Sequence, residues 1–214
     1  MRPLSSEQDE NATPPDRLIN SSDGRAYWEN VKGDVNGMLG GFSSISRIDL
    51  QGSRTFLARF GIGTKNDRQT LTNTLEGGAG IGRVTEGLLI PVSKNVDIVE
   101  PISKFTRSLQ GKQGIRNIFN VGLEDWQPDG GCEYDLIWVQ WCLGHLTDEQ
   151  IVRFLTVSKA VLKPTTGLIV VKENNTTTNG ADHFDETDSS VTRQVVLPGH
   201  EHLDGHRAFR NAQV

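Results

Sequence analysis

A glycine-rich turn, Gly78-Ala79-Gly80-Ile81-Gly82, constrains the fold of this chain more than any other feature. It follows the apolar, β-branched segment 70–75 and precedes a predicted helix over 83–89. Glycines let the backbone turn sharply and let a ligand approach it closely. The N-terminus of the helix offers free N–H groups and the positive end of the helix dipole. This strand–turn–helix pattern predicts a site for a nucleotide-like ligand.

Two acidic residues are expected near the turn, one directly before it and one at the end of the next predicted strand. Glu100 ends the next predicted strand about 20 residues on, where a ribose hydroxyl is bound in nucleotide sites. Glu76 directly precedes the glycines and can accept a hydrogen bond from an ammonium group, such as that of S-adenosylmethionine. The G-x-G-x-G spacing differs from the G-x-G-x-x-G of dinucleotide enzymes, and no P-loop lysine follows it. The alternative is a glycine-rich turn that binds no ligand. We disfavour it because the strand, the helix and Glu100 all occur at the expected distances from the turn in the sequence.

Predicted strands and helices alternate along the rest of the chain, which predicts an α/β fold with a mostly parallel sheet and helices on both faces. Before the first strand we expect a helical extension, with a short helix near 26–28 and another over 49–60 that Asp49 or Ser53 could cap. Thr147 is the expected N-cap of a helix over 148–162. The remaining predicted strands and helix are 96–100, 118–121, 134–141, 167–172 and 103–110.

Composition limits the class of protein. The 214 residues suit one domain, the net charge is -5, and no long Lys/Arg run indicates a nucleic-acid partner. The two cysteines, Cys132 and Cys142, form no paired motif, which favours a reducing compartment and argues against a disulfide scaffold or a structural metal site. We find neither a signal peptide nor an apolar run long enough to span a bilayer, so we expect no membrane partner and a cytoplasmic or nuclear location.

The two ends of the chain differ in composition from its centre. Residues 1–24 are rich in Ser, Asp, Asn, Pro and Glu and are predicted to be a disordered leader. The expected domain spans 25–193. Residues 194–214 show no convincing strand and are predicted to be an irregular tail.

Several short motifs together resemble those of the eukaryotic alpha-N-terminal protein methyltransferases, which methylate the α-amino group of proteins that begin Xaa-Pro-Lys after removal of methionine. The similarity extends over 27–193, and its most specific run is W-x-Q-W-x-x-G-H-L-T-D. It implies a Rossmann-like class I methyltransferase fold, the cofactor S-adenosyl-L-methionine, and protein substrates with an N-terminal Xaa-Pro-Lys. The motifs are Trp28, 37–41, 78–83, 137–141 and 144–148.

The resemblance also implies roles for single residues. His145 and Asp188 would assist proton removal. Trp28, Trp141 and Asn174 would bind the substrate N-terminus, and Asp185, Asp188 and Ser190 would surround the lysine at position three. The cofactor residues would be Gly78, Arg83, Glu100, Leu123, Glu124 and Gln140.

Taken alone, these residues have simpler interpretations. A lone His145 is more often a hydrogen-bonded structural histidine. Trp138 and Trp141 would lie on opposite faces of a strand, and an aromatic residue there is usually part of the core, although Trp141 follows the carboxyl end where ligands bind. The acidic run 182–188 is either a solvated loop or a site that attracts a cation.

The chain departs from the family at two places. Glu76-Gly77 and Glu100 replace the usual Asp-Cys and Asp. After Arg193 the family continues with a further helix and an antiparallel strand pair, which this chain is predicted to lack or complete only in part, with lowered stability. Two alternatives therefore stay open: a catalytically weak or inactive relative that still binds the cofactor, and a nicotinamide-dependent oxidoreductase.

Overall fold

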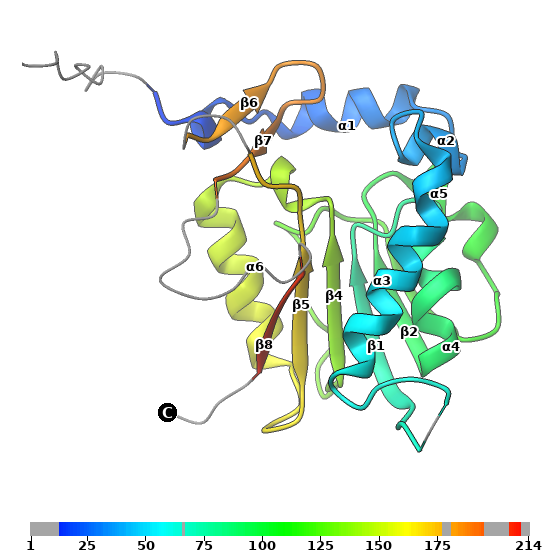
Figure 1. The fold of residues 1–214 in the computed structure, drawn as a ribbon. Coiled ribbons are helices and arrows are strands. Elements are labelled where there is room, and N and C mark those ends of the chain that lie inside the picture. Colours follow the sequence, from blue (N-terminus) through cyan, green and yellow to red (C-terminus); the bar gives the residue numbers. More distant parts are fainter. Residues whose placement is uncertain (1–12, 66, 177–180, 195–205, 211–214) are drawn as a thin grey trace, which may run out of the picture.

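A computed structural model describes residues 13–65, 67–176 and 181–194, together with the backbone of 206–210. Six of the described strands form a sheet of order β3-β2-β1-β4-β5-β8, in which β1 to β5 run parallel and β8 runs antiparallel to β5. This is the Rossmann-like class I fold that the sequence predicted (Figure 1). The strands are β1 Leu71–Gly77, β2 Ser93–Val99, β3 Ile115–Phe119, β4 Leu136–Gln140, β5 Leu168–Lys172 and β8 His206–Arg210.

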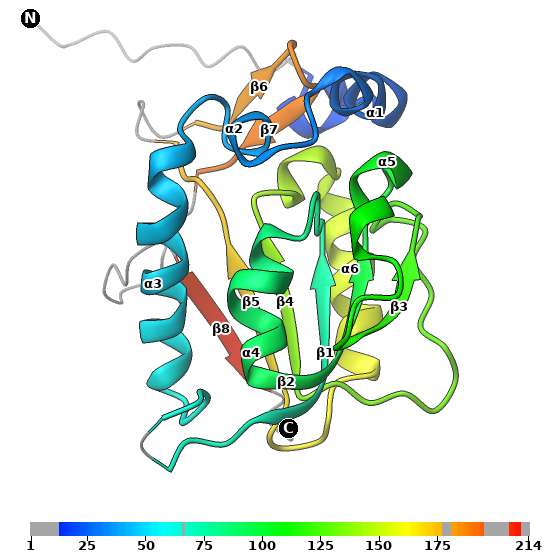
Figure 2. The same cartoon turned by 90° about the vertical axis from the view of Figure 1, so that its right-hand side faces the viewer.

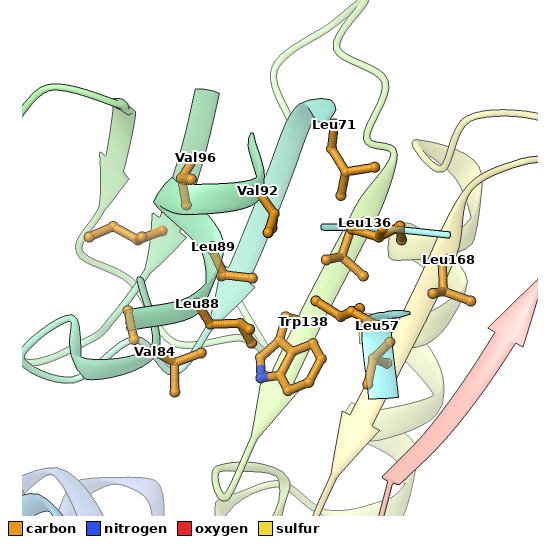
Figure 3. Close-up of a cluster of buried hydrophobic side chains, with 14 of the residues drawn as sticks. Leu57, Leu71, Val84, Leu88, Leu89, Val92, Val96, Leu136, Trp138 and Leu168 are labelled. Atoms are coloured by element: carbon orange, nitrogen blue, oxygen red, sulfur yellow. The ribbon is translucent and has the colours of Figure 1, made fainter. Parts of the chain in front are cut away.

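Helices cover both faces of the sheet, and each face has its own hydrophobic cluster. One face is covered by α3 (Ser46–Ala58) and by a second helix. This second helix consists of a π-helical turn, η3 (Thr85–Leu89), followed by α4 (Ile90–Val92). Trp138 of β4 lies between Leu57 of α3 and Leu88 of η3 (Figure 3). Trp138 is fully buried in this cluster, as expected for an aromatic residue on an apolar strand. The other face is covered by α6 (Asp148–Ala160) (Figure 2). There Phe154 of α6 packs with Trp126 and with the opposite side chains of the strands.

A capping box begins α6 at the predicted residue. The Thr147 hydroxyl accepts a hydrogen bond from the Gln150 amide at 3.3 Å, and the Thr147 amide donates to Oε1 of Gln150 at 2.8 Å. Two of the free N–H groups at this helix end are thereby satisfied. The expected helix 103–110 is present as a short α5 (Ser103–Thr106) followed by a 3-10 turn, η4 (Arg107–Leu109).

The predicted leader is shorter than expected, because regular structure begins well before residue 25. A 3-10 turn, η1 (Pro15–Leu18), precedes α1 (Ser21–Asn30), and Oδ1 of Asn20 caps α1 by accepting from the Ser22 amide at 3.0 Å. The polar residues that suggested disorder near residues 20–24 belong to the start of α1, a capped helix whose side chains are mostly exposed. Residues 1–12 lie outside the described part of the chain. The other short helices are α2 Val35–Met38 and η2 Ser43–Ile45.

The predicted irregular tail is also corrected in part. Within 194–214, residues 206–210 form β8, which pairs with the full length of β5. A parallel strand at the edge of a sheet exposes unpaired backbone groups, and β8 satisfies those of β5. The acidic segment expected as a loop includes a two-stranded hairpin, β6 (His183–Asp185) and β7 (Ser190–Thr192). Residues 195–205 and 211–214 lie outside the described residues.

None of the helices described is long and apolar enough to cross a bilayer. The same residues contain no group of three or more His, Cys, Asp or Glu side chains that could hold a metal ion.

Candidate functional site

A pocket lies at the carboxyl ends of β1, β2 and β4, beneath α1, which crosses this end of the sheet (Figure 1). Open α/β sheets bind their ligands at this end. The N-terminal helices, the glycine turn and the segment 122–124 contribute its walls. The structure brings nine of the predicted site residues into its lining: Trp28, Gly78, Arg83, Glu100, Leu123, Glu124, Gln140, Trp141 and His145.

The glycine turn forms the floor of this pocket. Gly78 has a φ of 69° and Gly80 a φ of 54°, which is the left-handed region that favours glycine. A Cβ atom on Gly78 would lie 2.6 Å from the side chain of Cys142, and one on Gly80 would lie 2.9 Å from Sδ of Met38. The turn therefore fits a ligand that approaches bare backbone, as a nucleoside with an amino acid end does.

Glu100 holds the turn in place from the end of β2. Its carboxylate accepts hydrogen bonds from the amides of Gly80 at 2.7 Å and Ile102 at 2.8 Å. Burial raises the pKa of Glu100, and these two hydrogen bonds oppose that shift. Glu100 thus lines the pocket, where the sequence placed it, and also supports the backbone of the turn.

Glu76 is 3% exposed and lies under the turn. The Thr85 hydroxyl donates a hydrogen bond to its Oε2 at 2.5 Å. Burial raises the pKa of Glu76 to about 8, against the effects of Thr85 and of the Arg83 charge. The side chain is therefore mostly protonated at neutral pH. Glu76 lines the pocket, and its hydrogen bond to an ammonium group stays a prediction.

Two predicted site residues, Arg83 and Gln140, bind the carboxylate of Asp49, to which the sequence analysis gave a different role. Asp49 lies inside α3 and does not cap it, because α3 begins at Ser46. Its carboxylate accepts from Nη1 of Arg83 at 2.6 Å and from Nε2 of Gln140 at 3.0 Å, and it also binds Lys172. The Arg83 guanidinium lies 5.4 Å from the ring centroid of Trp141, whose φ is 56°.

Trp28 and His145 contact each other in the lining of the pocket. Nε1 of Trp28 donates to Nε2 of His145 at 3.0 Å, and the two rings meet edge to face. Burial lowers the pKa of His145, and the nearby Asp188 charge opposes this shift. Gly24 of α1 allows this close packing, since a Cβ atom there would lie 3.1 Å from the Asp188 carbonyl oxygen and 3.4 Å from Nδ1 of His145.

Four predicted residues lie outside the pocket lining. Asp185 and Ser190 are opposite each other in the β6–β7 hairpin, and the Ser190 hydroxyl donates to Oδ1 of Asp188 at 2.6 Å. The hairpin lies beside α1 (Figure 2), and the Ser189 hydroxyl accepts from the Asn20 amide at 2.8 Å. The structure therefore groups Asp185, Asp188 and Ser190 at the rim of the pocket. Asn174 is exposed beyond the end of β5.

The sequence analysis missed Arg25, Asp49 and Lys172. Arg25 of α1 forms an ion pair with Glu124 at 2.6 Å, and both residues line the pocket. Asp49 lies at helical spacing from the buried Ser53 and Phe56, and this spacing could have placed it on the inner face of α3. Lys172, a buried cation at the end of an apolar strand, carried a similar signal, because such a charge requires a partner.

Comparisons with known proteins agree with this site. The AdoMet dependent proline di-methyltransferase family matches residues 16–198. N-terminal Xaa-Pro-Lys N-methyltransferase 1-A of Xenopus laevis is 43% identical over 80% of this chain and 77% of its own length. N-terminal Xaa-Pro-Lys N-methyltransferase 1 of Homo sapiens is 40% identical over 81% of this chain and 78% of its own.

A solved structure of a SAM-dependent methyltransferase from Leishmania major is 33% identical, with a TM-score of 0.70, and the match covers 81% of this chain and 68% of that chain. A phosphoethanolamine N-methyltransferase from Haemonchus contortus shares the fold alone, at 20% identity and a TM-score of 0.58, over 73% of this chain and 32% of that chain. These matches leave the nicotinamide-dependent alternative without support. The chain is an S-adenosylmethionine-dependent methyltransferase and belongs to the AdoMet dependent proline di-methyltransferase family.

Proposed function

We propose that this enzyme methylates the α-amino group of proteins that begin Xaa-Pro-Lys after removal of methionine. The observation that carries the proposal is that Trp28, Trp141 and His145 line the same pocket as the glycine turn, next to the acidic hairpin. Relatives more than 40% identical over most of the chain are named for this activity.

The proposal requires the enzyme to receive a neutral amine. An α-amino group has a pKa of about 7.7–8.0, so only a mild base is needed. His145 is held neutral by burial, and its single free lone pair at Nε2 accepts the Trp28 N–H. In the proposed complex the substrate amine takes the place of Trp28 at Nε2, and the Asp188 charge stabilises the protonated imidazole.

The hairpin provides a reason for lysine at position three. Asp185 and Asp188 are carried by one short hairpin, and the hydrogen bond from the Thr187 amide lowers the pKa of Asp185, which favours its ionised form. An ammonium group beside two carboxylates forms charge-assisted hydrogen bonds. Proline at position two fixes φ and reduces the entropy lost when an extended tail binds.

The chain's own residues would mainly position the amine and exclude water. S-adenosylmethionine supplies the methyl group from its sulfonium, in an in-line displacement. Trp28 and Trp141 come from α1 and the end of β4, so they can hold the first residue of the tail between the N-terminal extension and the sheet. Such positioning lowers the barrier by removing the entropy cost of the encounter.

The test is a methylation assay on an Xaa-Pro-Lys peptide with S-adenosylmethionine. Each methyl group transferred to the α-amine should raise the mass of the peptide by about 14 Da, the mass of one CH₂ group. An N-acetylated copy of the peptide is the matched control and should gain no mass. An Asp185→Lys/Asp188→Lys variant should lose its preference for lysine over glutamine at position three. A protein that is stabilised by S-adenosylmethionine in a thermal shift, yet methylates no such peptide, would be the inactive relative and would refute the proposal.

A further inference from the structure

The carboxylate of Asp49 binds three polar side chains, which come from three other parts of the fold. Its side chain is 5% exposed and accepts hydrogen bonds from Arg83, Gln140 and Lys172. Arg83 follows the glycine turn, Gln140 ends β4 and Lys172 ends β5. One carboxylate therefore joins α3 to the carboxyl ends of two strands and to the helix behind the turn.

The same carboxylate fixes the surroundings of Trp141. The Arg83 guanidinium lies 5.4 Å from the centroid of the Trp141 ring, and Nζ of Lys172 lies 5.8 Å from it. Cations at this distance from an aromatic face are attracted to it. Trp141 itself has a φ of 56°, a conformation that costs energy for a residue with a side chain and needs support from its neighbours.

The cluster carries a net positive charge. Two cations, Arg83 and Lys172, share the single carboxylate of Asp49, and their side chains are only 9% and 11% exposed. Burial raises the pKa of Asp49, but hydrogen bonds from Lys172 and Arg83 outweigh burial and lower it below its usual range, so Asp49 is ionised. The uncompensated positive charge suits an anionic group of a ligand.

Arg83, Gln140 and Trp141 line the pocket, whereas Asp49 and Lys172 lie behind them. We propose that Asp49 is a positioning residue: it holds Arg83 and Lys172 as a net-positive cluster that binds the carboxylate at the amino acid end of the cofactor, without itself touching the cofactor. The inference rests on the cofactor of the family and not on the proposed peptide substrate.

The test compares two ligands that differ at this end. S-adenosylhomocysteine carries the carboxylate, and 5′-methylthioadenosine lacks the whole amino acid group. In Asp49→Asn, which preserves shape, Arg83 and Lys172 lose the carboxylate that orients them. Because this loss of orientation outweighs the added positive charge, we expect the dissociation constant of S-adenosylhomocysteine to rise by about ten-fold or more, by calorimetry. That of 5′-methylthioadenosine should change by less than about two-fold.

Asp97→Asn is the matched control for a general loss of stability. Asp97 is fully buried and pairs with Arg116 at 2.5 Å and with the Tyr134 hydroxyl at 2.7 Å, outside the pocket lining. This variant should lower the melting temperature and leave the affinity for both ligands unchanged. Equal losses for the two ligands in Asp49→Asn, or an unchanged affinity for S-adenosylhomocysteine, would overturn the proposal.

A second variant decides the matter if Asp49→Asn does not fold. Lys172→Met leaves Asp49 paired with Arg83 and removes the excess charge of the cluster. It should weaken S-adenosylhomocysteine selectively and reduce the salt dependence of its binding. An unchanged ratio of the two affinities in this variant would equally refute the role assigned to the cluster.

Discussion

Nε1 of Trp28 donates a hydrogen bond to Nε2 of His145 at 3.0 Å, which joins α1 to the 3-10 turn η5 (Leu143–His145). A neutral imidazole has one acceptor nitrogen, so this contact assigns the proton to Nδ1. Protonation of Nε2 would break the contact. The pair therefore couples the charge of His145 to the attachment of the N-terminal helix.

Trp28→Phe should raise the pKa of His145, because the donor that favours the neutral ring is lost. The folded-state pKa of His145 in the native protein lies below its ordinary value of 6.5. Its contribution to stability is therefore present above pH 6.5 and is lost as the pH falls through the folded-state pKa. Titration of the imidazole by NMR measures the change. Trp126→Phe is the control, since Nε1 of Trp126 has no hydrogen-bond partner within the described residues and its loss should leave His145 unaltered.

Gly78→Ala should abolish measurable cofactor binding, because the added methyl group would lie 2.6 Å from Cβ and Sγ of Cys142 at a φ of 69°. Either the turn or Cys142, both of which line the pocket, must then shift. Gly52→Ala is the control: this glycine lies within α3 with nothing within 4 Å of the added atom. That substitution should stabilise the protein by about 0.5–1 kcal/mol. Calorimetry and thermal melting distinguish the two, and full cofactor affinity in Gly78→Ala would contradict the tight fit.

Arg25→Ala should speed cofactor dissociation, since Arg25 and Glu124 form an ion pair across the pocket between α1 and the loop after β3. The side chains are 44% and 14% exposed, so we expect the ion pair to contribute only about 0.2–1 kcal/mol. Because salt screens such a pair, high salt should speed cofactor dissociation from the native protein by a similar factor. Stopped-flow measurement of dissociation tests this. Arg17→Ala breaks an ion pair with Glu149 outside the pocket lining and should leave the rate unchanged.

Glu76→Gln should become progressively more stable than the native protein as the pH rises. The folded-state pKa of Glu76 is about 8, above its ordinary value of 4.5, so its stabilising contribution is complete below pH 4.5 and is lost as the pH rises to 8. The loss is at most about 1.4 kcal/mol per pH unit. Glutamine keeps an oxygen for the Thr85 hydroxyl and does not titrate.

Melting curves from pH 4 to pH 9 would show this gap widening and then levelling off near pH 8. Glu173→Gln is the matched comparison, because burial raises the pKa of Glu173 to about 6, and its gap should level off two units earlier. Parallel curves for the native protein and Glu76→Gln would show that Glu76 titrates normally.

Local patterns in the sequence located the features that local physics determines. The glycine turn, the five parallel strands and the cap at Thr147 all follow from short-range rules of conformation and hydrophobic spacing. The placement of Trp141 at the carboxyl end of β4 follows from chain direction, whereas its φ of 56° interrupts the strand alternation expected over 134–141.

Contacts between distant segments explain what the sequence did not reveal. Asp49 and Lys172 are 123 residues apart, and Arg25 and Glu124 are 99 apart, so no periodic pattern records these pairs. The strands β6 and β7 have three residues each, too few for an alternation to be recognised. Strand β8 is defined by its pairing with β5, which lies far away in the sequence. Helix α1 is stabilised by its cap and by its contacts with the pocket wall rather than by an apolar face.

Gly24 is the only buried residue of α1, although this helix covers the pocket. The sheet beneath it is held by two hydrophobic clusters, whereas the helix is held by a few polar contacts at its ends and along one side. Opening of α1 should therefore cost much less free energy than unfolding the sheet. Cofactor and product can then exchange through local opening, at a rate set by those few contacts and independent of the melting temperature of the whole protein.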